Sequence, residues 1–372
     1  MKLLYVVNEA QFFLSHRLPL GRQAIESGFE VAVVSAADTG EQLLAEHGFR
    51  HIPVPMSRSD FQLLDEFKTY RALRAIYQIE QPDLVHHVTI KPVVYGSFAA
   101  KSARVPAVVN AVPGMGFVFT RRGRAAALRR TFVNTLYRLA LSHRNMRVIF
   151  QNIEDLRGFL GHAIVRRDQA VLIRGSGVDL DSFPPAAEPP MPLTFVLPSR
   201  MLKDKGVVEF SEAAEQIRKT HPDWQFWLLG GVDPGNPSSL ATREIMDIEK
   251  RTGVRWLGHR DNVTAIMQEA HVVVLPSYRE GVPKVLLEAA ATGRAMIASD
   301  IAGCREVVTD GVTGLLVNPR SVSDLVTAML KLGEDAQLRQ RCAKAARTKA
   351  EAVFSIDDVV EHTFRVYEEL LV

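Results

Sequence analysis

The sequence predicts an α/β protein with two doubly wound, parallel-sheet domains, and three observations favour this fold class. Segments typical of strands and helices alternate along the first half, which indicates a parallel sheet with helical crossovers. A second alternation of the same kind begins at Leu193. The chain has 372 residues, more than a single hydrophobic core usually serves.

The first half supplies the strands of the first predicted domain, residues 1–180. The clearest helix there spans Asp60–Gln81 and ends against Pro82, because a residue before proline disfavours the helical conformation. Ser15, which follows the first strand, is a candidate N-cap for the next helix. Apolar runs predict strands at residues 2–7, 29–35, 83–88, 107–112 and 147–151, with a sixth candidate at 171–174.

A glycine- and proline-containing stretch separates the two alternating regions. Gly175 and Gly177 are interpreted as hinge glycines, because the third glycine and the following helix of a dinucleotide-binding fingerprint are absent. The proline-rich residues 184–192 predict a stiff interdomain linker. The second domain is expected over residues 193–354. Three helical patterns close the chain, at residues 321–332, 335–352 and 355–371.

Two carboxylates eight residues apart, Glu280 and Glu288, are the most informative feature of the chain. The preceding run 272–275 predicts a buried strand, and Pro283 suits the first turn of a following helix. Ligands of open α/β sheets bind at the carboxyl ends of the strands. Backbone amides at the start of that helix would favour an anion. The loop therefore predicts a binding site for a negatively charged ligand.

The spacing of Glu280 and Glu288 resembles the E-x7-E motif of family 4 of the retaining glycosyltransferases, which have the GT-B fold. The resemblance implies two Rossmann-like domains facing a cleft, with the last helix, at 355–372, crossing back to the first domain. It also implies transfer of a hexose or an N-acetylhexosamine. Five further segments are similar to this family in the same order, at residues 197–206, 228–231, 254–259, 302–308 and 310–317.

The resemblance also implies how a nucleotide-sugar donor, expected to be a UDP-sugar, is held. Glu288 would accept hydrogen bonds from the ribose hydroxyls, and Glu280 would accept them from the donor sugar. Arg200 and Lys205 would stabilise the charge that grows on the diphosphate. These cations and a helix N-terminus would take the place of a metal, so no metal and no cofactor are predicted. Further donor-binding residues are expected at Gly231, Gly281, Val282, Pro283 and Val285.

The acceptor is expected to bind to the first domain. Residues 12–17, Phe-Phe-Leu-Ser-His-Arg, resemble a subset of family 4 that builds polyprenol-linked oligosaccharides. The implied acceptor is a polyprenyl-diphosphate-linked saccharide in cell-surface glycan synthesis. His16 is the leading candidate for a contact with the transferred sugar or the acceptor hydroxyl, with His86 and His87 as lesser candidates. Two other loops look like the same subset, at residues 83–92 and 110–117.

A basic and apolar segment, residues 114–141, predicts peripheral membrane association. No acidic residue occurs between Asp83 and Glu154. Arginines beside an apolar loop suit an anionic membrane surface, whereas no nucleic-acid-binding motif accompanies them, so no nucleic-acid partner is expected. The residues concerned are Met115, Phe117, Val118, Phe119, Arg121, Arg122, Arg124, Arg129 and Arg130.

The remaining composition indicates a cytoplasmic protein bound to the inner face of the inner membrane. The two cysteines form no disulfide framework or metal-ligand spacing, which fits a reducing compartment. No run reaches the roughly 20 apolar residues of a membrane-spanning helix. Three alternatives remain open: a glycosyltransferase with a soluble acceptor, a UDP-sugar epimerase of similar two-domain fold, and a non-catalytic protein that binds sugar nucleotides.

Overall fold

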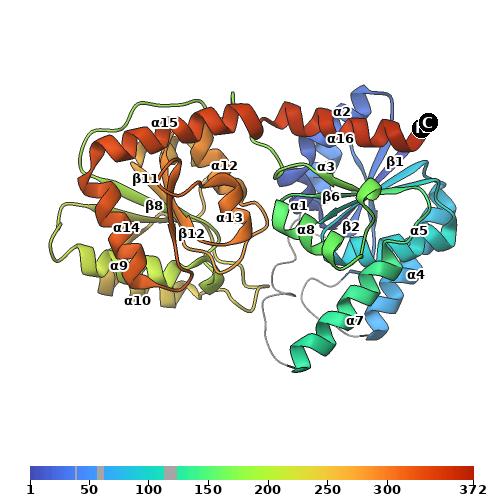
Figure 1. Cartoon of the computed structure of the whole chain (residues 1–372), viewed down its shortest axis with the longest axis horizontal. Coiled ribbons are helices and arrows are strands. Elements are labelled where there is room, and N and C mark those ends of the chain that lie inside the picture. Colours follow the sequence, from blue (N-terminus) through green and yellow to red (C-terminus); the bar gives the residue numbers. More distant parts are fainter. Residues whose placement is uncertain (38–39, 57–62, 113–123) are drawn as a thin grey trace. The chain divides into compact units, whose positions relative to one another are not determined.

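The structure is a computed structural model, and it describes residues 1–37, 40–56, 63–112 and 124–372. The side chains of residues 63 and 124–130 also lie outside the described part. The chain divides into two compact units (Figure 1). Unit 1 contains residues 1–176 and 358–372, and unit 2 contains residues 177–357.

Unit 1 is built on a parallel sheet of seven strands in the order β3-β2-β1-β4-β5-β6-β7. The chain adds β2 and β3 on one side of β1 and then crosses to β4 on the other side. This reversal is the topology of doubly wound folds. The strands are β1 (Lys2–Glu9), β2 (Glu30–Ala36), β3 (Arg50–Pro53), β4 (Leu84–Val88), β5 (Ala107–Val112), β6 (Met146–Phe150) and β7 (Ala170–Leu172).

Helices cover both faces of this sheet, and the burial of β1 shows why. Leu4 and Val6 join one buried apolar cluster, whereas Tyr5 joins the cluster on the opposite face. A strand buried on both faces has no polar alternation, so it appears in the sequence as a continuous apolar run. The helices of unit 1 are α1 (Ala10–His16), α2 (Leu18–Glu26), α3 (Glu41–Glu46), α4 (Leu63–Glu80), the π-helical η1 (Pro92–Gly96), α5 (Ser97–Ala103), α7 (Arg124–Ala140), α8 (Ile153–Gly161), the 3₁₀ turn η2 (Arg167–Gln169) and α16 (Ile356–Leu371).

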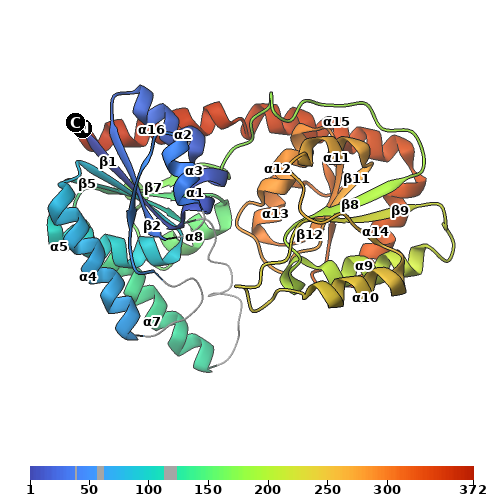
Figure 2. The same cartoon turned by 180° about the vertical axis from the view of Figure 1, so that it is seen from behind.

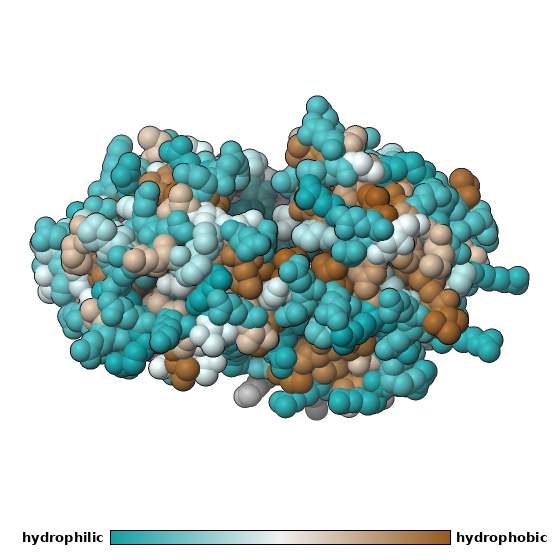
Figure 3. Space-filling model, turned by 90° about the horizontal axis from the view of Figure 1, so that it is seen from above, coloured by the Kyte–Doolittle hydropathy of each residue, from teal (hydrophilic) through white to brown (hydrophobic). Residues whose placement is uncertain are grey.

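The C-terminal helix α16 packs on unit 1, as the GT-B likeness implied. Val366 and Tyr367 lie in the same buried cluster as α1 and α2, and Figure 2 shows α16 beside α2. The Tyr367 hydroxyl donates to the Tyr5 hydroxyl at 3.2 Å, so it must accept the 2.6 Å hydrogen bond from Nδ1 of His86. The outward face of α16 carries exposed residues such as Glu361 and Arg365. Figure 3 shows the protein from above, where hydrophilic residues predominate around scattered apolar patches.

Unit 2 contains a six-stranded parallel sheet in the order β10-β9-β8-β11-β12-β13, again reversing beside its first strand. Its strands are β8 (Thr194–Pro198), β9 (Gln225–Leu229), β10 (Arg255–Trp256), β11 (Val272–Leu275), β12 (Ala295–Ser299) and β13 (Gly314–Val317). Its helices are the 3₁₀ turn η3 (Lys203–Lys205), α9 (Val207–Ile217), α10 (Thr242–Thr252), α11 (Val263–Glu269), α12 (Lys284–Ala291), α13 (Ala302–Val307), α14 (Val322–Glu334) and α15 (Ala336–Val353).

The proline-rich stretch 184–192 is not a free linker. The chain leaves unit 1 between Ser176 and Gly177, and the stretch belongs to unit 2. Arg294 donates to the carbonyls of Ala186 and Ala187, and Glu188 accepts from Arg339. The linker prediction is wrong because these arginines lie far along the sequence, where local composition cannot reveal the contact.

Two smaller expectations also need correction. Ser15 is not an N-cap: α1 begins at Ala10, and the Ser15 hydroxyl donates to the carbonyl of Gln11 within the helix. Pro283 is the N-cap of α12, with φ −72° and ψ 118°, rather than a residue of its first turn. The fixed φ of proline suits that extended position as well.

Candidate active site

The site residues of unit 2 lie where the order of its strands reverses. Arg200 and Lys205 follow β8, and Glu280 follows β11, the strand that pairs with β8. Gly231 follows β9, the other neighbour of β8. Because all strands are parallel, their carboxyl ends meet at one edge of the sheet, and this edge at the switch point is where open α/β sheets bind ligands.

Two loops from this edge pack tightly against each other. The amide of Tyr278 donates to the carbonyl of Asp204 at 2.9 Å, which joins the loop after β11 to the loop after β8. Gly206 ends the loop after β8 with φ +76°, and a Cβ there would lie 2.4 Å from the carbonyl oxygen of Pro276. Only glycine fits both the left-handed backbone and this close approach.

Lys205 and Glu280 are brought into direct contact. Nζ of Lys205 lies 2.5 Å from Oε1 of Glu280, although 75 residues separate them. Both side chains are largely buried, which makes the charged hydrogen bond stronger than it would be at the surface. The structure thus places an ammonium and a carboxylate side by side, one suited to a phosphate and the other to sugar hydroxyls.

Arg200 lies on the same loop as Lys205 but pairs with a different carboxylate. Its Nη1 lies 2.5 Å from Oδ2 of Asp233, a residue that the sequence prediction missed. Asp233 follows Gly231 in the loop after β9. Its position two residues past the predicted donor-binding glycine was the one available signal.

Glu288 lies one turn into α12, and its side chain is largely buried. Burial raises the pKa of this carboxyl, and the Lys284 ammonium opposes that shift from 3.4 Å, measured between Nζ and Oε1. Lys284 therefore offsets part of the cost of burying the charged carboxylate, the form that accepts hydrogen bonds most strongly.

Five further donor-binding residues were predicted: Pro283 is the N-cap described above, and the other four are two glycines and two valines. Val282 is buried in the core, and the partly buried Val285 packs against it. Gly281 is covered by α13: a Cβ on Gly303 would lie 1.3 Å from the carbonyl oxygen of Gly281. The carbonyl of Gly231 accepts from the amide of Met201 at 2.9 Å.

A second set of polar residues at this edge was not predicted. The Tyr278 hydroxyl donates to Oε1 of Glu209 at 2.5 Å, and burial and this carboxylate raise the pKa of Tyr278 to about 12. The guanidinium of Arg320 lies 4.3 Å from the centre of the Tyr278 ring. Arg279 pairs with Asp204 at 2.8 Å. Tyr278 and Arg279 directly precede Glu280, which is the sequence signal that could have found them.

The histidines of unit 1 differ in accessibility. His16 ends α1, half-buried, with its ring stacked on Phe12 and Nδ1 2.7 Å from the Ser15 hydroxyl. His86 and His87 are buried, and burial lowers the pKa of His87 to about 4. His87 bonds to Tyr77 and Asn110 inside the unit. Of the three candidate histidines, His16 is therefore the one that is open to a substrate.

No group of three or more His, Cys, Asp or Glu side chains is placed to hold a metal ion within the described residues. Asp179 and Asp181 have an Asp-x-Asp spacing, but Asp179 is used locally. It accepts from the amides of Asp181 and Ser182 at 3.0 and 3.1 Å and from the Ser182 hydroxyl at 2.5 Å. This pair therefore forms a turn.

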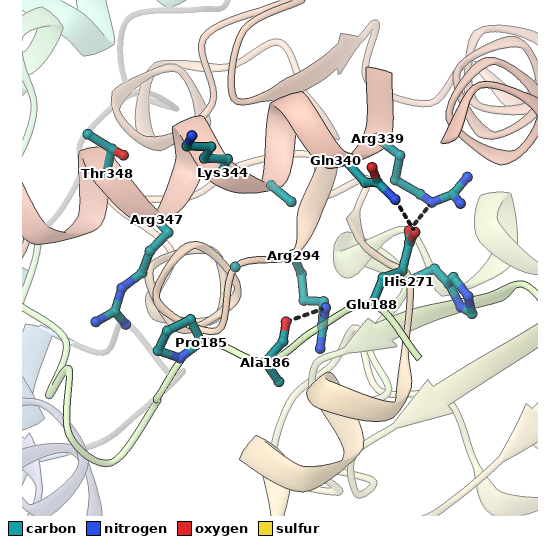
Figure 4. Close-up of a pocket in the computed structure, with 12 residues that line it drawn as sticks. Pro185, Ala186, Glu188, His271, Arg294, Arg339, Gln340, Lys344, Arg347 and Thr348 are labelled. Atoms are coloured by element: carbon teal, nitrogen blue, oxygen red, sulfur yellow. Dashed lines mark hydrogen bonds and ion pairs between the residues drawn. The ribbon is translucent and has the colours of Figure 1, made fainter. Parts of the chain in front are cut away.

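A basic cavity of about 310 Å³ lies at the opposite, amino-terminal edge of the same sheet (Figure 4). Its arginines are engaged with backbone: Arg294 donates to four carbonyls, and Arg339 and Arg347 donate to two each. Several of these carbonyls belong to the last turns of α11, α12 and α14, where backbone carbonyls have no partner further along the helix. These hydrogen bonds hold residues 183–188 against the rest of unit 2, and the cavity is not the candidate site.

Sequence comparisons match the chain to known glycosyltransferases. Residues 180–349 match the family model "Glycosyl transferases group 1", and residues 2–152 match "Glycosyl transferase 4-like". A Campylobacter jejuni N,N'-diacetylbacillosaminyl-diphospho-undecaprenol alpha-1,3-N-acetylgalactosaminyltransferase is 28% identical over 381 residues, covering 96% of this chain and 98% of its own. An Escherichia coli UDP-Gal:alpha-D-GlcNAc-diphosphoundecaprenol alpha-1,3-galactosyltransferase is 27% identical over 332 residues, covering 86% and 84%.

Solved structures show the same fold across the whole chain. A glycosyltransferase from Rickettsia africae superposes with a TM-score of 0.79 at 17% identity, covering 100% of this chain and 98% of the other. Anabaena HepE in complex with UDP and glucose gives 0.76 at 19% identity, covering 99% of each chain. Two doubly wound units of this kind form the GT-B fold of glycosyltransferases. The chain belongs to the family 4 glycosyltransferases, in the group 1 and 4-like domain families.

Proposed function

We propose that the enzyme transfers a hexose or an N-acetylhexosamine from a UDP-sugar to a polyprenyl-diphosphate-linked saccharide, with retention of configuration and without a metal ion. The observation that carries this proposal is the arrangement at the reversal point of unit 2. Lys205 and Glu280 are in contact there, Arg200 follows the same strand, and a buried Glu288 lies on the next helix.

The chemistry of the transfer follows from these groups. The bond between C1 of the sugar and the diphosphate oxygen breaks, and a bond from C1 to the acceptor oxygen forms on the same face. The acceptor's hydroxyl proton passes to the departing diphosphate. Lys205 and Arg200 stabilise the growing negative charge, and Glu280 binds donor-sugar hydroxyls. Glu288 binds the ribose.

The acceptor class is supported by two relatives that match most of the chain. Both names describe transfer to a sugar on diphosphoundecaprenol, and both products are α-linked. A UDP-hexose is itself α-linked, so an α-linked product is the outcome of retention. His16, half-buried at the end of α1, is proposed to contact the acceptor or the transferred sugar.

Peripheral docking on the membrane is part of the proposal. Residues 113–123 and the side chains of 124–130 lie outside the described part. For the predicted membrane segment 114–141, the structure therefore describes the backbone of α7 and the side chains from residue 131 onward. Its later residues Phe132 and Leu139 are 68% and 56% exposed. None of the described helices is long and apolar enough to cross a bilayer.

Helix α4 adds a second candidate surface in unit 1. Leu64, Phe67 and Ile79 are 77%, 58% and 79% exposed, and Arg71 and Arg74 are exposed on the same side of the helix. Exposed apolar groups beside cations are typical of helices that lie on anionic membranes.

The proposal is tested by measuring UDP release from a panel of UDP-sugars with three acceptors. These are a polyprenyl-diphosphate saccharide, the same saccharide without lipid, and no acceptor. We expect fast release with the lipid-linked acceptor and an α-linked product by NMR. Equal rates with the free saccharide would favour the soluble-acceptor alternative. Release of UDP with free 2-epimeric sugar and no acceptor dependence would favour an epimerase.

A further inference from the structure

The loop after β9, residues 231–240, is stitched to the loop that carries Arg200 and Lys205. The amide of Lys203 donates to the carbonyl of Ser238 at 2.8 Å, and the amide of Leu240 donates to the carbonyl of Met201 at 2.8 Å. The amide of Asp204 donates to the Ser238 hydroxyl at 3.1 Å. Each loop therefore holds the backbone of the other in place.

Neither loop can shift alone without breaking these bonds.

Asp233 occupies a fixed place in this pair of loops. Its amide donates to the Ser239 hydroxyl at 3.0 Å, and its side chain is 12% exposed. Arg200, its partner, is 49% exposed. The Asp233 carboxylate is thus the anchored and more buried member of the pair. The Arg200 side chain is the more exposed member, at the carboxyl edge of the sheet.

The contact uses only part of the guanidinium. Among the described residues, the Arg200 side chain makes one hydrogen bond, from Nη1 to Oδ2 of Asp233. Arginine carries five N–H donors in a rigid, planar fork. The bond at Nη1 therefore restrains where the fork lies, and it leaves Nε and Nη2 available for the oxygens of a phosphate.

We propose that Asp233 is a positioning residue, which holds the Arg200 guanidinium in the orientation that meets the leaving diphosphate. The inference rests on the proposed function, because it needs Arg200 to act on that diphosphate. It adds a residue from the loop after β9, which the E-x7-E pattern and the Arg200/Lys205 pair do not include. Preorganised donors stabilise a transition state because they need not reorient as charge develops.

The test compares Asp233→Ala and Asp233→Asn with Arg200→Ala, the Asp233→Ala/Arg200→Ala double variant, and Asp247→Ala. Asp247 is an exposed acid on α10 and serves as the matched control. We expect Asp233→Ala to lower kcat by about tenfold or more, by analogy with the loss of a partner that orients a metal ligand. Asp233→Asn, which keeps an acceptor oxygen, should lose less. Affinity for uridine, which has no phosphate, and the melting temperature should match those of Asp247→Ala.

The double variant separates positioning from loop structure. If Asp233 acts through Arg200, its removal should change kcat little once Arg200 is already alanine. A loss of uridine affinity equal to the loss of kcat, or full additivity in the double variant, would overturn the inference. So would tighter UDP binding by Asp233→Ala, since the carboxylate would then compete with the diphosphate. Wild-type turnover by Arg200→Ala would instead reject the cation clamp of the proposed function, and the inference with it.

Discussion

The environment of Glu288 indicates its ligand more specifically than that of the other site residues. A carboxylate buried beside one lysine needs further hydrogen-bond donors, and two ribose hydroxyls would supply them. Glu288→Gln should therefore weaken UDP binding by about 1–3 kcal/mol, the usual loss for a hydrogen bond to a charged group. Calorimetry with UDP measures this, with Glu269→Gln, an exposed glutamate on α11, as the control. Equal affinity in both variants would remove Glu288 from the ribose.

The sequence could predict which residues belong to the site, but not which of them pair with one another. The family resemblance assigned Lys205 and Glu280 to one donor site, and the structure brings them into contact. The pairing of Arg200 with Asp233 could not be foreseen, because it depends on how a third loop folds back. His87 was a candidate for contact with substrate and is buried, since a strand covered on both faces buries polar residues along with apolar ones.

At the scale of elements, burial decided which strands the sequence could reveal. The run 272–275 predicted β11 with its observed bounds, because all four residues are buried. Strand β3 was missed: Arg50–Pro53 forms an edge of the sheet, has no fully buried residue and ends in proline, so it shows no apolar run. Helix α4 was expected from Asp60, and its described part begins at Leu63.

The exposed side of α4 makes a prediction about membrane binding. Replacing Arg71 and Arg74 with serine should lower binding to anionic liposomes and reduce its salt sensitivity, because surface attraction is screened within about 10 Å at 0.1 M salt. Replacing Leu64 and Phe67 with serine should weaken binding without changing the salt sensitivity, because that contribution is apolar burial.

Co-sedimentation measures both effects, with Met246→Ser as the control. Met246 is an exposed apolar residue on α10 of unit 2. Calorimetric affinity for UDP should be unchanged in every variant, because the donor site belongs to unit 2. Equal binding by wild type and all variants would remove α4 from the membrane surface.

For the whole molecule, the two-sheet architecture and the returning C-terminal helix were predictable, the first from alternation and the second from family resemblance. Both strand orders reverse beside the first strand, which alternation alone does not specify. The reversal places Arg200, Lys205 and Glu280 in the loops that follow two neighbouring strands, and it gives unit 2 a single edge for ribose, diphosphate and sugar.

The central claim is that protein cations at this edge neutralise the leaving diphosphate. The most direct measurement is kcat at saturating donor for wild type and Lys205→Ala, each with and without EDTA. Removing one preorganised group should lower kcat by about a hundredfold or more, and EDTA should leave wild-type turnover unchanged. Wild-type turnover by Lys205→Ala, or a loss in EDTA that magnesium or manganese restores, would contradict the account.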